Sequence, residues 1–177
     1  MSYTFTTPMA GLMPIANTDS GVTQPNASSA TPTPPMYPGM IVKATDPTYG
    51  EGEFILLLGV ASTIVGSLVR YNAVSYQTVL VVNTAVQDVP VAVAMSANTG
   101  ATWGWYQIGG TAALAKTAVI NLPNVPVFLS ATAGKVKALA SAGLQVVACR
   151  TQLVTTASAA GTVLVTINRP HLQSQIT

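Results

Sequence analysis

Short hydrophobic runs recur from residue 39 to the end of the chain, and each is bounded by Gly, Pro, Asn or Ser. In TVLVTIN (162–168), apolar β-branched residues alternate with polar residues, and Leu164 interrupts the polar side. This period of two is typical of a β-strand, and the apolar residue on its second face indicates a sheet covered on both sides. Runs of this kind predict strands at 40–45, 53–58, 67–72, 78–83, 89–95, 101–108, 125–130, 135–139, 144–153 and 162–169.

Serine and glycine separate several of these runs, as in SANTG (96–100), SATAG (130–134) and SAAG (158–161). Glycine permits a positive φ and serine can bond the local backbone, so these phrases predict hairpin turns. One further segment, TAALAKTAVI (111–120), is interpreted as a short helix. The pattern therefore predicts an all-β body over residues 39–177, built as a small barrel or sandwich of short strands.

Residues 1–38 differ from this body, because they hold seven of the twelve prolines and a single charge, Asp19. Proline fixes φ and removes a backbone donor, so the segment is neither a long helix nor a central strand. We expect an extended, Pro-rich N-terminal arm whose apolar side chains bind a partner. The candidate partner-binding residues of the arm are Tyr3, Phe5, Met9, Leu12, Met13 and Ile15.

Both tryptophans lie in TWGWYQIGG (102–110), where no charged residue is near. On a strand, Trp103 and Trp105 share one face and Tyr106 points to the other. Aromatic residues of this kind are common in cores and are also enriched at protein interfaces. Both interpretations stay open for these three residues, which are further candidates for partner binding.

Charge is scarce along the whole chain. Only 7% of residues are charged, against about 25% in an ordinary soluble domain, while 49% are hydrophobic. A free monomer of this composition would be poorly soluble, so we expect a protein embedded in a membrane or in a large assembly. The longest apolar run, 54–69, has 16 residues broken by Gly and Ser, too short for a spanning helix, which needs about 20. A signal peptide begins with basic residues, but no basic residue precedes Lys43. We therefore expect neither a membrane protein nor a secreted one.

The few charges are unevenly distributed. Residues 1–88 hold all five acidic residues and two basic ones, a net charge of −3, whereas residues 89–177 hold five basic residues and no acid, a net charge of +5. The bases are scattered, so nucleic-acid binding is not expected. The asymmetry favours contacts between the basic half and acidic groups such as Glu51, Glu53 and Asp88 of another copy, or an acidic partner surface.

Groups that could support catalysis are few. The chain has one histidine, His171, and one cysteine, Cys149, which we expect to be a buried thiol. A closed zinc site needs about four such ligands, so no metal site and no cofactor are expected. Glu51 and Glu53 could share a strand face suited to a cation, but the glycines around them favour a turn. We therefore expect a protein that is not an enzyme.

The body resembles the decoration, or cement, proteins of tailed-bacteriophage heads. The resemblance lies in EGEFILLLGVASTIVGSLVRYN (51–72), ATWGWYQIGGTA (101–112), VPVFLSATAGKVKAL (125–139) and TVLVTINRPH (162–171). It implies a β-barrel protein of the virion that binds the outer surface of the capsid and stabilises it by clamping neighbouring major capsid subunits. It also implies a homo-oligomer, a dimer or a trimer, with the major capsid protein as its partner and no catalytic residues.

Two other classes remain open. A head-fibre or tail β-domain would bind a host receptor, would form elongated trimers and would recognise cell-surface glycans. A hydrolase or lyase on a β-scaffold would require His171, Cys149 and an acid to converge in the fold.

Overall fold

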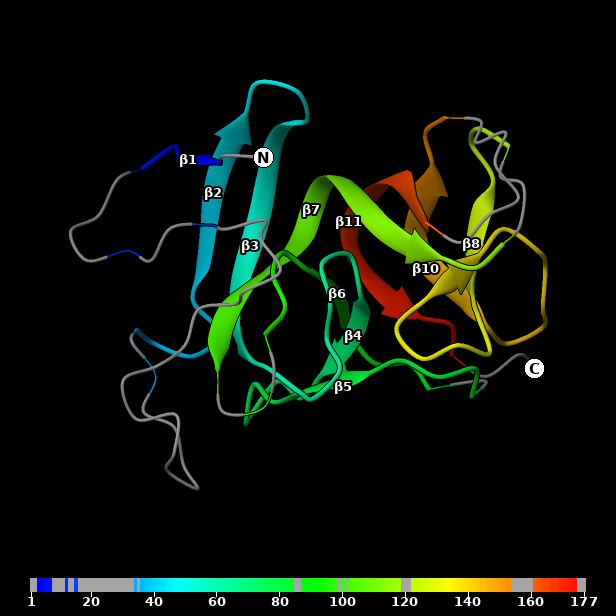
Figure 1. The fold of residues 1–177 in the computed structure, drawn as a ribbon, viewed down its shortest axis with the longest axis horizontal. Coiled ribbons are helices and arrows are strands. Elements are labelled where there is room, and N and C mark those ends of the chain that lie inside the picture. The colour runs from blue at the N-terminus through cyan, green and yellow to red at the C-terminus, as the bar shows by residue number, and fades with distance from the viewer. Residues whose placement is uncertain are drawn as a thin grey trace.

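The computed structural model describes residues 3–7, 12, 15, 34, 36–84, 87–98, 100, 102–118, 122–153 and 161–174. These residues contain no helix, and their strands belong to one sheet (Figure 1). The all-β prediction is confirmed. The strands are β1 (Thr4–Phe5), β2 (Ile41–Asp46), β3 (Gly50–Leu58), β4 (Leu68–Tyr71), β5 (Thr78–Leu80), β6 (Val91–Ala94), β7 (Trp103–Lys116), β8 (Pro126–Leu129), β9 (Val136–Lys137), β10 (Gln145–Thr151) and β11 (Gly161–Leu172).

Each of the ten predicted runs contains a strand, but the helix predicted at 111–120 is wrong. Residues 111–116 are the second half of β7, which pairs with β11 from Gly109 to Lys116. Alanine favours a helix on its own, yet the ladder to β11 and the burial of Ala112 and Leu114 override that preference.

Strand β7 is the longest strand and changes partners along its length. Its first half pairs with β3 and β6, and its second half pairs with β11 and, in parallel, with β9. The change falls at Gly109 and Gly110. Figure 1 shows β7 crossing the molecule between β3 and β11.

The pairings close two rings that share β7. One runs β7–β11–β10–β8–β9 and returns to β7 through the pair Lys116↔Val136. The other runs β3–β7–β6–β4–β5 and is closed by a bridge between Leu58 and Gln77. Closed rings of this kind fit a small barrel better than two stacked sheets.

Alternation along β3 and β7 divides the core into layers. Ile55, Leu57 and Tyr106 point into one cluster, shared with β4 and β6. Phe54 and Trp105 point to the opposite face, where a second cluster forms. A third and larger cluster fills the ring of β11, β10, β8 and β9. The sheet around β7 is therefore covered on both faces, as the apolar residues on both faces of its strands require.

Among the described residues, no helix has the length and hydrophobicity needed to cross a membrane.

Candidate functional site

The first candidate site is the outer face of β3 and β7, here called the aromatic face, formed by Phe54, Leu56, Trp103 and Trp105. Strand alternation places these four side chains together, because Leu56 pairs with Trp105 across the ladder. Trp103 and Trp105 are only 4% and 1% exposed. The two tryptophans therefore belong to the core of the single chain.

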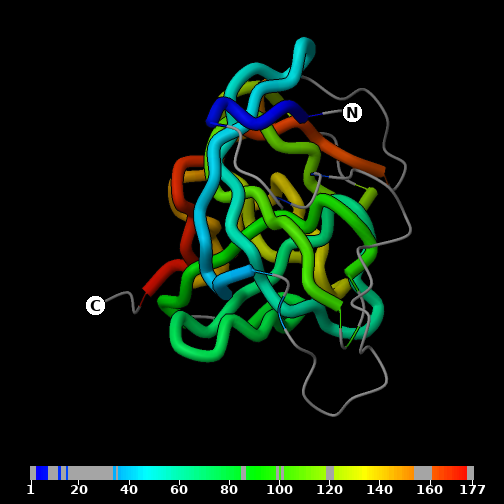
Figure 2. Tube along the Cα trace, turned by 90° about the vertical axis from the view of Figure 1, so that its left-hand side faces the viewer, coloured from blue at the N-terminus to red at the C-terminus, as the bar shows by residue number. Residues whose placement is uncertain are grey.

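The N-terminal arm covers this face. Strand β1 pairs antiparallel with the edge strand β2, and the Thr6 N–H donates to the Lys43 carbonyl at 3.0 Å. The Tyr3 ring meets Phe54 edge to face at a centroid distance of 4.8 Å, and Phe5 meets Trp105 in the same manner at 6.1 Å. Figures 1 and 2 show β1 beside the β2–β3 hairpin in two perpendicular views. The arm thus adds a short edge strand and an aromatic layer to the sheet.

Two further arm residues join the same cluster. Ile15 is 3% exposed and Leu12 is half-buried against the aromatic face. Met9 and Met13 lie outside the described residues. Four of the six predicted arm residues therefore pack on the chain's own body, which provides the apolar pockets that such side chains need. Their binding to a neighbouring subunit stays a prediction.

Polar groups lie at the margin of the arm contact. Burial, together with the nearby Asp46 carboxylate, raises the pKa of Tyr3 to about 12. Asp46 is itself buried and accepts hydrogen bonds from the backbone N–H groups of Thr48 and Tyr49, at 2.8 and 3.0 Å. These bonds hold Asp46 in its own turn, where its carboxylate acts on Tyr3.

Tyr106, the third aromatic residue predicted from TWGWYQIGG, points the other way. It is completely buried between β3 and the β4–β6 layer, and this burial raises its pKa to about 12. Tyr106 therefore offers no surface to a partner, and its role is to fill the interior.

The glutamates predicted to lie in a turn are on β3, so that interpretation is wrong. Glu51 pairs with Thr45 and Glu53 with Lys43 in the β2–β3 ladder, where Gly52 between them pairs with Ala44. The Lys43 ammonium lies 3.3 Å from Glu51 and 3.8 Å from Glu53, and Arg169 lies 3.4 Å from Glu53. Both acids are therefore in contact with bases of their own chain.

Cys149 and His171 lie on the neighbouring strands β10 and β11 but do not face one another. Cys149 is buried in the core, and this burial raises the pKa of its thiol to about 12, whereas His171 is exposed. A protonated, buried thiol is a poor nucleophile. Among the described residues, no group of three or more His, Cys, Asp or Glu side chains is placed to hold a metal ion.

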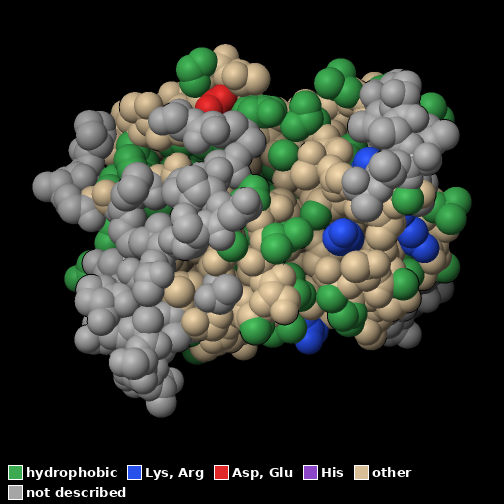
Figure 3. All heavy atoms as spheres, in the orientation of Figure 1, with side chains coloured by type: hydrophobic (Ala, Val, Ile, Leu, Met, Phe, Trp, Pro, Cys, Tyr) green, Lys and Arg blue, Asp and Glu red, His purple; other side chains and the backbone are tan. Residues whose placement is uncertain are grey.

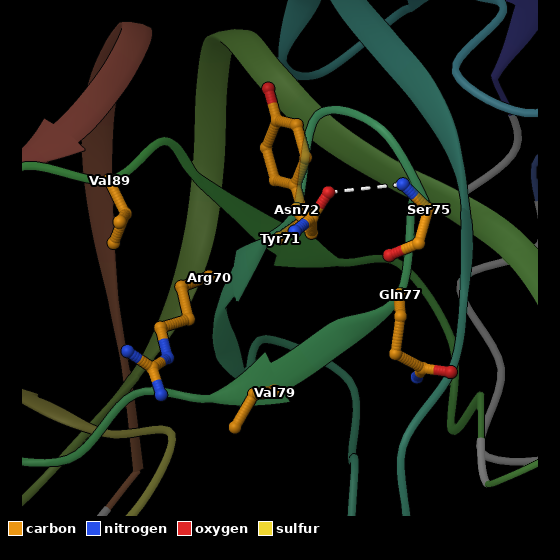
Figure 4. Close-up of a pocket in the computed structure, with 7 residues that line it drawn as sticks. All are labelled: Arg70, Tyr71, Asn72, Ser75, Gln77, Val79 and Val89. Carbon is orange, nitrogen blue, oxygen red and sulfur yellow. Dashed lines mark hydrogen bonds between the residues drawn. The ribbon is translucent and has the colours of Figure 1, made fainter.

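A second candidate site is an open groove of about 340 Å³ beside β4 and β5 (Figure 4). Most of its lining residues lie in runs predicted as strands, but Ser75 and Gln77 do not, and the groove itself was not predicted. The residues that line it are Arg70, Tyr71, Asn72, Ser75, Gln77, Val79 and Val89. In the close-up, Arg70 and Val89 lie on one side, Ser75 and Gln77 on the other, and Val79 lies between and below them.

A smaller hollow of about 140 Å³ shares Tyr71 with the groove. Its lining includes Ile41, Pro90, Arg169 and His171. Tyr71 thus stands between two concave surfaces, each with an arginine in its wall.

No protein-family model matches the chain, and no curated protein matches it either. The resemblance to phage decoration proteins is therefore an inference from the residues alone. The arm-covered aromatic face and the open groove are the two features from which a function can be inferred.

Proposed function

We propose that this protein is a structural component of a phage virion that binds the outside of the capsid and stabilises it by clamping neighbouring major capsid subunits. The observation that carries the proposal is a surface with few charges and many exposed hydrophobic side chains. The large hydrophobic residues that are exposed are Tyr37, Ile41, Ile64, Val74, Val79, Val82, Leu122, Leu139 and Leu153.

The exposure of these side chains is substantial. Tyr37 and Val74 are 86% and 88% exposed, while the whole chain has only 12 charged residues. Figure 3 shows one face on which hydrophobic side chains are scattered and charged ones are few. A surface with so little charge makes a free monomer prone to association, which supports a place in a larger assembly.

The arm supports a clamping role. Among the described residues, its contacts with the body are a two-residue strand and a set of apolar side chains, and residues 16–35 separate Ile15 from Met36, which packs against the same cluster. A connection of 20 residues reaches at most about 70 Å when extended. An arm of this length can therefore reach the equivalent aromatic face of a neighbouring subunit and bind there.

The test is co-sedimentation of purified protein with capsids stripped of their decoration. We expect the full chain to bind and to raise the temperature at which the heads release DNA, and a chain lacking residues 1–38 to bind more weakly. Absence of binding to heads, together with binding to host cells, would instead support the receptor-binding class. Equal binding of the full and the truncated chain would mean that the arm does not contribute to the clamp.

A further inference from the structure

Arg70 occupies a fixed position in the wall of the open groove. Its backbone lies in the central strand β4, paired with Val79 of β5 on one side and with Val91 of β6 on the other. Its guanidinium donates from Nη1 to Gln87 Oε1 at 2.7 Å, and Gln87 in turn donates to the Thr84 carbonyl at 2.7 Å. Backbone and side chain are thus both held before any ligand arrives.

The positive charge of Arg70 has no carboxylate partner among the described residues. The ion pairs that these residues form involve Lys43, Glu51, Glu53 and Arg169. Asp88 lies next to the groove residue Val89 in the sequence but forms no ion pair with Arg70. Since a guanidinium has five N–H donors and one bond here goes to Gln87, donors remain for an external anion.

The opposite wall carries neutral hydrogen-bonding groups. Asn72 Oδ1 accepts from the Val74 and Ser75 N–H groups at 2.7 and 3.0 Å, which locks the turn. Gln77 Nε2 donates to the Gly59 carbonyl at 2.9 Å, so this amide also bonds to the protein's own backbone. The amide nitrogen of Asn72 and the hydroxyl of Ser75 remain for a ligand.

The groove therefore combines a fixed cation, the apolar side chains of Val79 and Val89, and a rim with a hydroxyl and an amide. Its volume, about 340 Å³, lies at the small end of ligand sites, which run from about 300 to 1,000 Å³. We propose that it binds a sugar unit that carries a carboxylate, such as a uronic acid. The carboxylate pairs with Arg70, the hydroxyls bond Ser75 and Asn72, and the C–H face of the ring packs on the valines. This site is independent of capsid binding.

The experiment is a titration of the full chain followed by amide NMR shifts, with D-glucuronate as the probe. D-Glucose is the neutral match, and acetate is the carboxylate without a ring. We expect shifts confined to β4, β5 and the turn over residues 72–77, and affinities for glucose and acetate at least about tenfold weaker than for glucuronate.

Arg70→Gln should weaken glucuronate binding at least about tenfold. The matched control is Arg150→Gln, which removes an exposed guanidinium on β10 that donates to the Asn124 carbonyl, and it should leave binding unchanged. Should Arg70→Gln fail to fold, Arg70→Lys and Ser75→Ala carry the test, each with a severalfold loss. Equal binding of acetate and glucuronate, no saturable binding, shifts elsewhere, or equal losses in the Arg70 and Arg150 variants would overturn the proposal.

Discussion

Gly110 is the residue at which β7 leaves β3 and joins β11. Its φ is +92°, a conformation that side-chain-bearing residues rarely adopt, and a Cβ placed there would lie 2.3 Å from the Glu51 carbonyl oxygen. Backbone cannot move aside as a flexible side chain can. The absence of a side chain at Gly110 thus allows β7 to pair in both rings.

Gly110→Ala should therefore lower the free energy of unfolding by about 2–3 kcal/mol, measured by urea denaturation. Gly161→Ala is the matched control, since nothing lies within 4 Å of a Cβ at that position and its φ is not in the strained range. The control should change stability by less than about 1 kcal/mol. Equal effects of the two substitutions would contradict the role given to Gly110.

A buried thiol and a buried phenol make the stability of the fold depend on pH in the alkaline range. Burial raises the pKa of Cys149 from 9.0 and that of Tyr106 from 10.0, each to about 12. In the unfolded chain both groups lose their protons first, so the unfolded state gains stability as pH rises. The contribution of these two groups to the free energy of unfolding should be fully present well below pH 9 and should be lost as pH rises from about 9 to 12.

Urea denaturation at pH 8, 10 and 11 measures this fall. Tyr106→Phe removes one of the groups and should make the fall shallower between pH 10 and 11 than in the unmodified chain. Tyr37→Phe, at an exposed tyrosine, is the control and should leave the slope unchanged. A flat profile up to pH 11 would refute the prediction.

At the scale of elements, strands were predictable wherever apolar and polar residues alternate between turn residues. The helix prediction over 111–120 was wrong because the alanines favour a helix locally, whereas the hydrogen bonds to β11, which the local sequence does not reveal, hold residues 111–116 in a strand. Tyr3, Phe5, Leu12 and Ile15 were predictable as apolar anchors, but the chain's own aromatic face as their binding surface was not. The groove around Arg70 was missed because its walls come from two strands, a turn and a loop that carry no common periodicity.

The arm and the aromatic face form one element pair that can be tested by truncation. Removal of residues 1–38 should leave a folded body while exposing Trp103 and Trp105, because Tyr3, Phe5, Leu12 and Ile15 cover that face. We expect a red shift of tryptophan emission and stronger quenching by iodide.

Tyr37→Ser in the full chain is the control, since it alters an exposed side chain and leaves the cover in place. It should give the emission of the unmodified protein. Unchanged emission after truncation would mean that the arm does not shield the tryptophans.

At the scale of the whole molecule, the composition does not favour a soluble monomer. The formal net charge is +2, and the bases Lys43 and Arg169 already contact acids of the same chain. Repulsion between copies is therefore weak, and apolar residues such as Leu122, Leu139 and Leu153 remain exposed.

We expect the purified protein to form a defined dimer or trimer in sedimentation velocity experiments. Because apolar contacts dominate, raising the salt concentration should not dissociate it, whereas salt would weaken an assembly held by ion pairs. A stable monomer at high protein concentration would count against both the oligomer and the assembly role.

The strand shared by the two rings also sets the order in which the chain can fold as it leaves the ribosome. Strands β3 to β6 emerge before β7, so their ring is incomplete at that stage, and the second half of β7 has no antiparallel partner until residues 161–172 are made. Strand β11 thus completes the ladder on β7. Nascent chains that stop before residue 161 should remain open to protease, and protection should appear abruptly once β11 is free of the exit tunnel.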